Sequence, residues 1–436
     1  MPLTPLALAL LLLPALIPLV RELAPWAGIL GPTAFLAIVA VIVLDHLGSR
    51  RHAVLELQRV TDDKLSLGAE NRVEIRVRNR CPAKLSLLVK DDPPAAFVTE
   101  RRVFRLALAS YAQDRVSYHT RPLARGRYAF GDLHVRGRSR LGLSFWQRRF
   151  PAPAEIAVYP NLLEVRRYQL LARSDRLRQA GFRLTRRLGQ GTEFESLREY
   201  TPDDDFRSID WKATARRRHP ISRQYETERS QTVIIMIDAG RMMSTLVGDL
   251  SRLDYALNAA LMFAYVAVER DDAVGLIAFA DDVKAFVPPR KGHRQVGLIT
   301  EALYDLQPAL VEPDYAEAFA LLSSRARKRA LVVCFTDLVD VDASSRLLGH
   351  LTALAPHHLP LLITLRDRDL QQAAQRSPAD VGEAYQRALA AQVLHDRETA
   401  LGVLRQRGVM VLDALPEKLT VAAVNEYLGL KARGRL

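Results

Sequence analysis

Apolar residues fill most of the first 49 positions, in two runs at residues 3–20 and 27–47. An α-helix rises roughly 1.5 Å per residue and the hydrocarbon core of a bilayer is about 30 Å thick, so each run has about the length of a membrane span. The stretch 21–26 between them contains Trp26, a residue that suits the membrane interface. We therefore expect residues 1–49 to form a transmembrane helical hairpin.

Alternation of apolar and charged positions replaces these runs between residues 50 and 160. Residues 72–78 read Arg-Val-Glu-Ile-Arg-Val-Arg, the pattern of a strand with one buried face. Shorter runs of the same kind, separated by Gly, Asn, Asp and Pro, lie at 85–89, 103–108, 115–119 and 133–136. About six or seven strands without a long helical pattern predict an antiparallel β-sandwich of immunoglobulin-like type over residues 50–160.

From residue 232 to 436, continuous apolar runs alternate with helical periodicity. Residues 233–237 are apolar up to Asp238, as expected of a parallel strand buried on both faces, and a helical pattern follows at 251–269. Further strands are expected at 274–279, 283–287, 331–335, 361–365 and 409–412, and a last helix at 416–430. This order predicts a doubly wound α/β domain with its binding crevice at the carboxyl ends of the strands.

Two aspartates, Asp238 and Asp337, follow predicted strands and are expected at that crevice, where two carboxylates suit a divalent cation such as Mg²⁺. The arrangement resembles the von Willebrand factor A-type fold, whose metal-ion-dependent adhesion site combines Asp-x-Ser-x-Ser, a Thr and a second Asp. Here the serine positions are Gly240 and Met242, and Asp314 lies in the threonine region. The resemblance therefore implies a degenerate, weak metal site of Asp238, Asp337 and Asp314. Helix capping or bonding to backbone amides is the alternative role for these aspartates.

Charge is distributed unevenly along the chain. Its 62 Lys and Arg exceed its 49 Asp and Glu by 13, but the first 49 residues carry −1 and the remaining 387 carry +14. Arg50 and Arg51 directly follow the second apolar run, and basic flanks of membrane spans stay in the cytoplasm. We therefore expect two spans in the cytoplasmic (inner) membrane and the soluble domains in the cytoplasm.

Eight arginines lie between Arg166 and Arg187, opposed only by Asp175. Such a run is typical of a solvated face, and contact with anionic lipid headgroups is a second interpretation because a membrane anchor precedes it. The run contains only Tyr168 and Phe182 as rings that stack against bases. It therefore does not favour nucleic acid as a partner.

The connecting segment, residues 161–231, holds the densest mixture of charged and aromatic side chains. We expect it to fold through ion pairs and aromatic anchors and to offer a partner surface. The residues of this predicted surface are Arg198, Tyr200, Asp204, Asp205, Arg207, Asp210, Trp211, Lys212 and Arg216.

Part of this segment resembles the hallmark of the bacterial "domain of unknown function 58" family, Leu-Arg-x-Tyr-x-Pro-Gly-Asp-Asp-x-Arg-x-Ile-x-Trp-Lys-x-x-Ala-Arg. It departs from the hallmark at Asp203, where the family has glycine. The matching residues are Leu197, Arg198, Tyr200, Pro202, Asp204, Asp205, Arg207, Ile209, Trp211, Lys212, Ala215 and Arg216.

This family resemblance implies a von Willebrand factor A-like C-terminal domain and a MoxR-type AAA+ ATPase as partner. The expected function is that of a membrane-anchored adaptor in protein maturation, in metal or cofactor insertion, or in envelope assembly. No phosphate-binding loop or Gly-x-Ser-x-Gly motif is present, so we expect no catalytic or cofactor-binding residues. The alternative is a metal-dependent hydrolase or phosphotransferase centred on Asp238 and Asp337.

Overall fold

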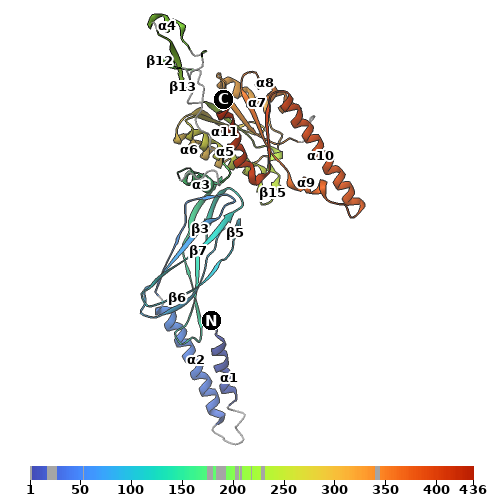
Figure 1. The fold of residues 1–436 in the computed structure, drawn as a ribbon. Coiled ribbons are helices and arrows are strands. Elements are labelled where there is room, and N and C mark those ends of the chain that lie inside the picture. The colour runs from blue at the N-terminus through green and yellow to red at the C-terminus, as the bar shows by residue number, and fades with distance from the viewer. Residues whose placement is uncertain are drawn as a thin grey trace. The chain divides into compact units, whose positions relative to one another are not determined.

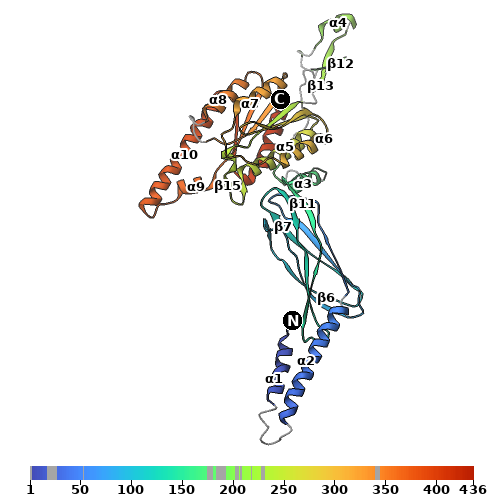
Figure 2. The same cartoon turned by 180° about the vertical axis from the view of Figure 1, so that it is seen from behind.

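The chain forms two compact units, Met1–Tyr159 and Pro160–Leu436 (Figures 1 and 2). The computed structural model describes residues 2–16, 27–52, 54–173, 180–182, 193–201, 206, 209–217, 219–226, 231–338 and 344–436. The first unit contains two apolar helices and a set of β-sheets. The second contains an α/β domain and a separate β-hairpin.

Two apolar helices begin the first unit: α1 (Pro5–Leu16) and α2 (Ala27–His52). Within α2, Ile29–Ser49 is long and apolar enough to cross a membrane, and 17% of this stretch is buried. It is the one such stretch among the described residues. The 12 residues of α1 extend roughly 18 Å, less than the bilayer core, and residues 17–20 of the first predicted span lie outside the described part of the chain.

Residues 54–159 form three small sheets, which confirms the β-rich character expected of this region. Val73, Ile75 and Val77 of the alternating stretch are fully buried. The sheets have the strand orders β1-β3-β7-β5, β10-β9-β4-β6 and β2-β11-β8, and the β2–β11 pair is parallel rather than antiparallel. The strands are β1 (Leu55–Val60), β2 (Lys64–Ser66), β3 (Asn71–Asn79), β4 (Leu85–Lys90), β5 (Phe97–Thr99), β6 (Val103–Leu108), β7 (Gln113–Pro122), β8 (Gly126–Phe130), β9 (Leu133–Arg138), β10 (Phe145–Phe150) and β11 (Ala154–Tyr159).

The turn between β9 and β10 is hydrogen-bonded to both apolar helices. Near the end of α2, the Asp45 carboxylate accepts the N–H of Leu141 at 3.0 Å. Just before α1, the Thr4 hydroxyl donates to the carbonyl of Gly142 at 2.8 Å. The start of α1 and the end of α2 therefore lie beside the same turn.

The second unit confirms the predicted alternation of strands and helices. Its elements are α3 (Leu162–Arg173), β12 (Glu193–Glu199), α4 (Trp211–Arg217), β13 (Ile221–Glu226), β14 (Thr232–Asp238), a 3-10 turn (Arg241–Ser244), β15 (Leu246–Val247), β16 (Leu250–Ser251), α5 (Arg252–Glu269), β17 (Ala273–Phe279), β18 (Val283–Arg290), α6 (His293–Tyr304), α7 (Tyr315–Arg325), β19 (Leu331–Phe335), α8 (Ser345–Leu354), β20 (Leu359–Leu365), α9 (Arg368–Gln375), α10 (Val381–Gln406), β21 (Met410–Ala414), a 3-10 turn (Pro416–Lys418) and α11 (Leu419–Ala432).

A six-stranded sheet of order β18-β17-β14-β19-β20-β21 lies at the centre of this unit (Figure 1). Side chains of β14 alternate between its faces: Ile235 packs in the core formed with α5 and α11, and Met236 packs in the core formed with α7, α8 and α10. Neighbouring strands are parallel except β18, which pairs antiparallel with β17. The strand order reverses at β14 and β19, so the crevice at their carboxyl ends is the expected position of a binding site.

Candidate functional site

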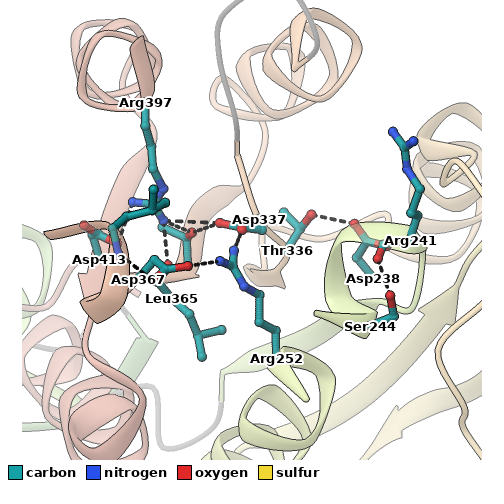
Figure 3. A network of polar contacts seen from close by, with 12 residues as sticks. Asp238, Arg241, Ser244, Arg252, Thr336, Asp337, Leu365, Asp367, Arg397 and Asp413 are labelled. Carbon is teal, nitrogen blue, oxygen red and sulfur yellow. Dashed lines mark hydrogen bonds and ion pairs between the residues drawn. The ribbon is translucent and has the colours of Figure 1, made fainter. Parts of the chain in front are cut away.

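Asp238 and Asp337 lie at this crevice, at the ends of the adjacent strands β14 and β19 (Figure 3). Asp238 is the last residue of β14, and Asp337 comes two residues after Phe335, which ends β19. Asp238 is 2% exposed and Asp337 is 7% exposed. Sequence reasoning therefore placed both carboxylates at the correct edge of the sheet.

Hydroxyl and amide groups of the chain occupy the oxygens of Asp238. Its Oδ2 accepts from the Thr336 hydroxyl at 2.6 Å and from the Tyr315 hydroxyl at 3.1 Å, and its Oδ1 accepts from the Gly240 N–H at 2.7 Å. Burial raises the pKa of Asp238, while the bonds from Thr336 and Gly240 act in the opposite direction. This carboxylate is thus held by three internal donors.

Gly240 stands at a serine position of the adhesion-site pattern, and its surroundings leave little room for a side chain. A Cβ there would lie 3.0 Å from Asp238 Oδ1, 3.0 Å from Pro313 and 3.1 Å from the Val311 carbonyl oxygen. A serine would have to displace these neighbours. The absence of a side chain at position 240 therefore allows the backbone of this loop to approach Asp238 and bond to it directly.

Asp337 is paired with two arginines from distant parts of the chain (Figure 3). Its Oδ2 forms an ion pair with Arg252 Nη1, and only 2% of the Asp337 side chain and 8% of the Arg252 side chain are exposed. Its Oδ1 accepts from Arg397 Nη2 at 3.2 Å and from the Thr364 hydroxyl at 3.0 Å. Guanidinium groups therefore neutralise this buried carboxylate.

Helix capping brings Arg252 to this position. The Ser251 hydroxyl accepts the Asp254 N–H at 3.1 Å and the Asp254 carboxylate accepts the Ser251 N–H at 3.2 Å, a capping box that starts α5 at Arg252. Arg252 Nη2 also donates to Asp367 Oδ2 at 2.8 Å, and Asp367 caps α9. The same arginine thus connects α5, the loop after β19 and the start of α9.

Arg397 extends the network to the other strand ends. From within α10 it donates to the Leu365 carbonyl at 2.8 Å and to Asp413 Oδ1 at 3.1 Å. Arg366 Nε donates to the second oxygen of Asp413 at 3.1 Å. The network therefore fixes α5, α9 and α10 to the carboxyl ends of β19, β20 and β21.

The three carboxylates predicted as metal ligands do not fit the metal of the adhesion site, because their oxygens bond to other groups of the chain. Asp314, the third predicted ligand, is the N-cap of α7, where its Oδ1 accepts the Glu317 N–H at 3.1 Å. Asp238 is bonded by hydroxyl and amide donors, and Asp337 by arginines. Within the part of the chain that the structure describes, no group of three or more His, Cys, Asp or Glu side chains is arranged to hold a metal ion.

The predicted partner surface lies on a separate hairpin, in which β12 and β13 form a two-stranded sheet and α4 lies between them (Figure 1). We call this hairpin, residues 193–226, the arm. Asp210 caps α4, because its Oδ1 accepts the N–H groups of Lys212 at 2.9 Å and Ala213 at 3.0 Å. The Asp210 N–H donates to the Ile221 carbonyl at 2.8 Å. Asp210 therefore holds α4 on the arm rather than facing a partner.

Aromatic and basic side chains are exposed at the α4 end of the arm. Phe206 is 65% exposed and Trp211 is 61% exposed, and their rings meet edge to face with centroids 5.5 Å apart. Lys212 and Arg216 on α4 are also exposed. An exposed aromatic pair beside basic residues is suited to a partner that is apolar at its centre and acidic at its rim.

The remaining predicted residues are only partly described. Tyr200 lies at the end of β12, where its N–H donates to the Pro220 carbonyl at 3.0 Å, and Arg198 is a residue of β12. Asp204, Asp205 and Arg207 lie outside the described residues. Of the arginine run, three members lie on α3 and the other five lie outside the described residues: Arg166, Arg167 and Arg173 are on α3, and Arg176, Arg178, Arg183, Arg186 and Arg187 are not described.

Five side chains that bond to Asp238 or Asp337 were missed from the sequence: Arg252, Tyr315, Thr336, Thr364 and Arg397. Arg252 and Arg397 reach Asp337 over 85 and 60 positions of chain, so no local motif contains them. Tyr315 lies in the region compared with the adhesion-site threonine, and its hydroxyl does reach Asp238. A search for any hydroxyl in that region, rather than for threonine, would have found it.

A family model matches most of the arm and five strands of the six-stranded sheet. Residues 196–398 match the family described as "Protein of unknown function DUF58". We call these residues the DUF58 region. The uncharacterised protein Rv1480 of Mycobacterium tuberculosis is 29% identical over 221 residues, which cover 50% of this chain and 64% of that protein. YeaD of Bacillus subtilis, also uncharacterised, is 27% identical over 186 residues, 40% of this chain and 46% of that protein.

The matched segments thus cover less than two thirds of either relative. Among solved structures, the CARDB domain of the PF1109 protein from Pyrococcus furiosus is 12% identical and covers 24% of this chain and 94% of its own, with a TM-score of 0.19.

Proposed function

We propose that this protein is a non-catalytic, membrane-anchored adaptor whose DUF58 region docks a MoxR-type AAA+ ATPase, in protein maturation, metal or cofactor insertion, or envelope assembly. The exposed Phe206–Trp211 pair on the arm carries the proposal. Solvent-exposed aromatic pairs are characteristic of interfaces, where Trp and Tyr supply much of the binding energy.

We further assign the α/β domain to the von Willebrand factor A-like group. The sheet order, with β18 as an antiparallel edge strand, supports this assignment. In this domain the carboxylates at the crevice bond to the chain itself, so the docking role falls to the arm.

The membrane anchor is proposed to be a helical hairpin with both ends in the cytoplasm. Three observations support it: α1 packs beside α2, the start of α1 and the end of α2 bond to the same β9–β10 turn, and apolar side chains of α2 face outward. Ile29, Leu36 and Leu44 are 74%, 66% and 69% exposed, as expected of a lipid-facing helix rather than a buried one. The bonds of α2 to the β9–β10 turn also favour its retention over cleavage as a signal peptide.

Direct binding to a purified MoxR-type ATPase tests the adaptor role. The full chain in lipid nanodiscs should bind the ATPase. A variant in which a two-residue turn replaces residues 200–220 of the arm should bind it with an affinity at least tenfold lower. Biolayer interferometry gives the affinities, and circular dichroism confirms that the α/β domain remains folded. Equal binding by the shortened variant would contradict the proposal.

Titration with Mg²⁺ or Mn²⁺ tests the metal-dependent alternative centred on Asp238 and Asp337. Because Asp337 is paired with arginine and Asp238 is bonded to hydroxyls, we expect no saturable heat in calorimetry of the full chain in detergent at millimolar metal. Asp337→Ala serves as the control for unspecific heat. Saturable binding that Asp238→Ala abolishes would favour the hydrolase or phosphotransferase instead.

A further inference from the structure

The β9–β10 turn carries an unassigned surface next to the candidate membrane span. Arg138, Arg140 and Leu141 are exposed on it, and Leu141 is 59% exposed. Gly142 adopts a φ of +75°, in the left-handed region that favours glycine, and so closes the turn behind Leu141. The tip of this turn therefore combines an exposed leucine with two exposed arginines that precede it in the sequence.

Hydrogen bonds fix the depth of this turn relative to α2. The Ser49 hydroxyl accepts the Arg140 N–H at 2.8 Å, and the Asp45 carboxylate accepts the Leu141 N–H at 3.0 Å. Ser49 is the last residue of the apolar stretch Ile29–Ser49, and Asp45 lies inside it. Because both acceptors belong to the end of the span, the turn lies where the span leaves the hydrocarbon.

Contacts with the start of α1 hold the turn from its other side. Phe145 donates its N–H to the Pro2 carbonyl at 2.9 Å, and Thr4 donates its N–H to the Leu143 carbonyl at 3.1 Å. Leu143 also packs in a small buried cluster with apolar residues of α1 and α2. The turn is therefore a rigid element clamped between the two helices rather than a loose loop.

We propose that the β9–β10 turn docks on the anionic phospholipid headgroups of the membrane that α2 spans. Leu141 enters the interfacial layer, which is about 5–8 Å thick on each side of the hydrocarbon, and Arg138 and Arg140 contact headgroup phosphates. Each basic side chain near such a surface favours the bound state by on the order of fivefold. This inference rests on the proposed membrane anchoring, and it assigns lipid contact to a different surface from the arginine run at 166–187.

Depth-dependent fluorescence quenching tests the position of the turn. Leu141→Cys is labelled with an environment-sensitive fluorophore in the full chain, reconstituted in phosphatidylcholine vesicles with or without phosphatidylglycerol; Cys81 and Cys334 are buried. The matched control is Val98→Cys on β5, where the side chain is 48% exposed at the end of the β-sheets away from α2 (Figure 1). Spin-labelled lipids should quench the probe at position 141 and leave the probe at position 98 unaffected. Equal quenching at the two positions would overturn the proposal.

Charge removal tests the anionic contact. The enrichment of anionic lipid beside the turn is measured as quenching of the probe at position 141 by spin-labelled phosphatidylglycerol relative to spin-labelled phosphatidylcholine. Arg140→Gln should lower this ratio by about fivefold, whereas Arg127→Gln, which changes an exposed arginine on β8, should leave it unchanged. Equal effects of the two variants, or equal quenching by the two spin-labelled lipids, would overturn headgroup recognition. Extraction by alkaline carbonate distinguishes failure of the membrane anchor from failure of the docking by the turn. A chain that is extracted from the vesicles would refute the anchor and this inference together. A chain that is retained but carries an unquenched probe at position 141 would refute only the docking of the turn.

Discussion

Replacing Arg252 by methionine should destabilise the α/β domain by about 3 kcal/mol, because Asp337 and Asp367 would both lose part of the positive charge that compensates them in a buried ion-pair network. Asp337 would keep Arg397 as a partner, and Asp367 would lose the donor that lies 2.8 Å away. For a domain of this size the midpoint of thermal unfolding should fall by on the order of 10 °C. Differential scanning calorimetry of the detergent-solubilised chain measures the shift.

Arg241→Met is the matched control, since Arg241 pairs with Glu312 on the surface, where the two side chains are 60% and 72% exposed. Exposed pairs contribute less than about 1 kcal/mol. The double variant Arg252→Met/Asp337→Leu removes both members of this pair, while Arg397 keeps Asp413 as a partner. It should recover at least half of the lost stability, because two apolar side chains often replace a buried pair without loss. Equal destabilisation by Arg252→Met and Arg241→Met would show that the network does not hold the strand ends.

The central strands were predictable because burial on both faces leaves a local signature. β14 and β19 appear in the sequence as unbroken apolar runs, and the start of α5 is marked by Ser251 and Asp254, whose side chains form the capping box. The alternation in β3 was equally clear, since its apolar residues face one way. Short strands such as β2 and β5, three residues each, carry no such pattern and were not predicted.

The strand-end site was predictable in position but not in chemistry. A strand followed by aspartate is a local pattern, so Asp238 and Asp337 were found. Their partners are not local, because Arg397 joins Asp337 only after the chain has folded through α8, β20 and α9. Missing hydroxyls at Gly240 and Met242 indicated that the adhesion site is altered, but only the structure shows that arginine is the cation beside Asp337.

The position of Arg252 beside Asp337 favours the arm over the crevice as the proposed docking surface. Arg252 is 6% exposed, and its charge is shared between Asp337 and Asp367. A partner carboxylate at the crevice would have to compete with both. The arm instead exposes Phe206 and Trp211 without such competition, so the structure separates a closed strand-end network from an open aromatic surface.

If the proposed MoxR-type ATPase docks on the arm, replacing Trp211 by alanine should weaken its binding by about 2 kcal/mol or more, a rise in Kd of about thirtyfold. Exposed tryptophans that become buried at an interface are among its strongest contributors. Tyr385→Ala is the matched control: Tyr385 is 71% exposed on α10, outside the arm. Lys212→Gln should chiefly slow association and reduce its dependence on salt. Loss of binding with Tyr385→Ala but not with Trp211→Ala would move the docking surface from the arm to α10.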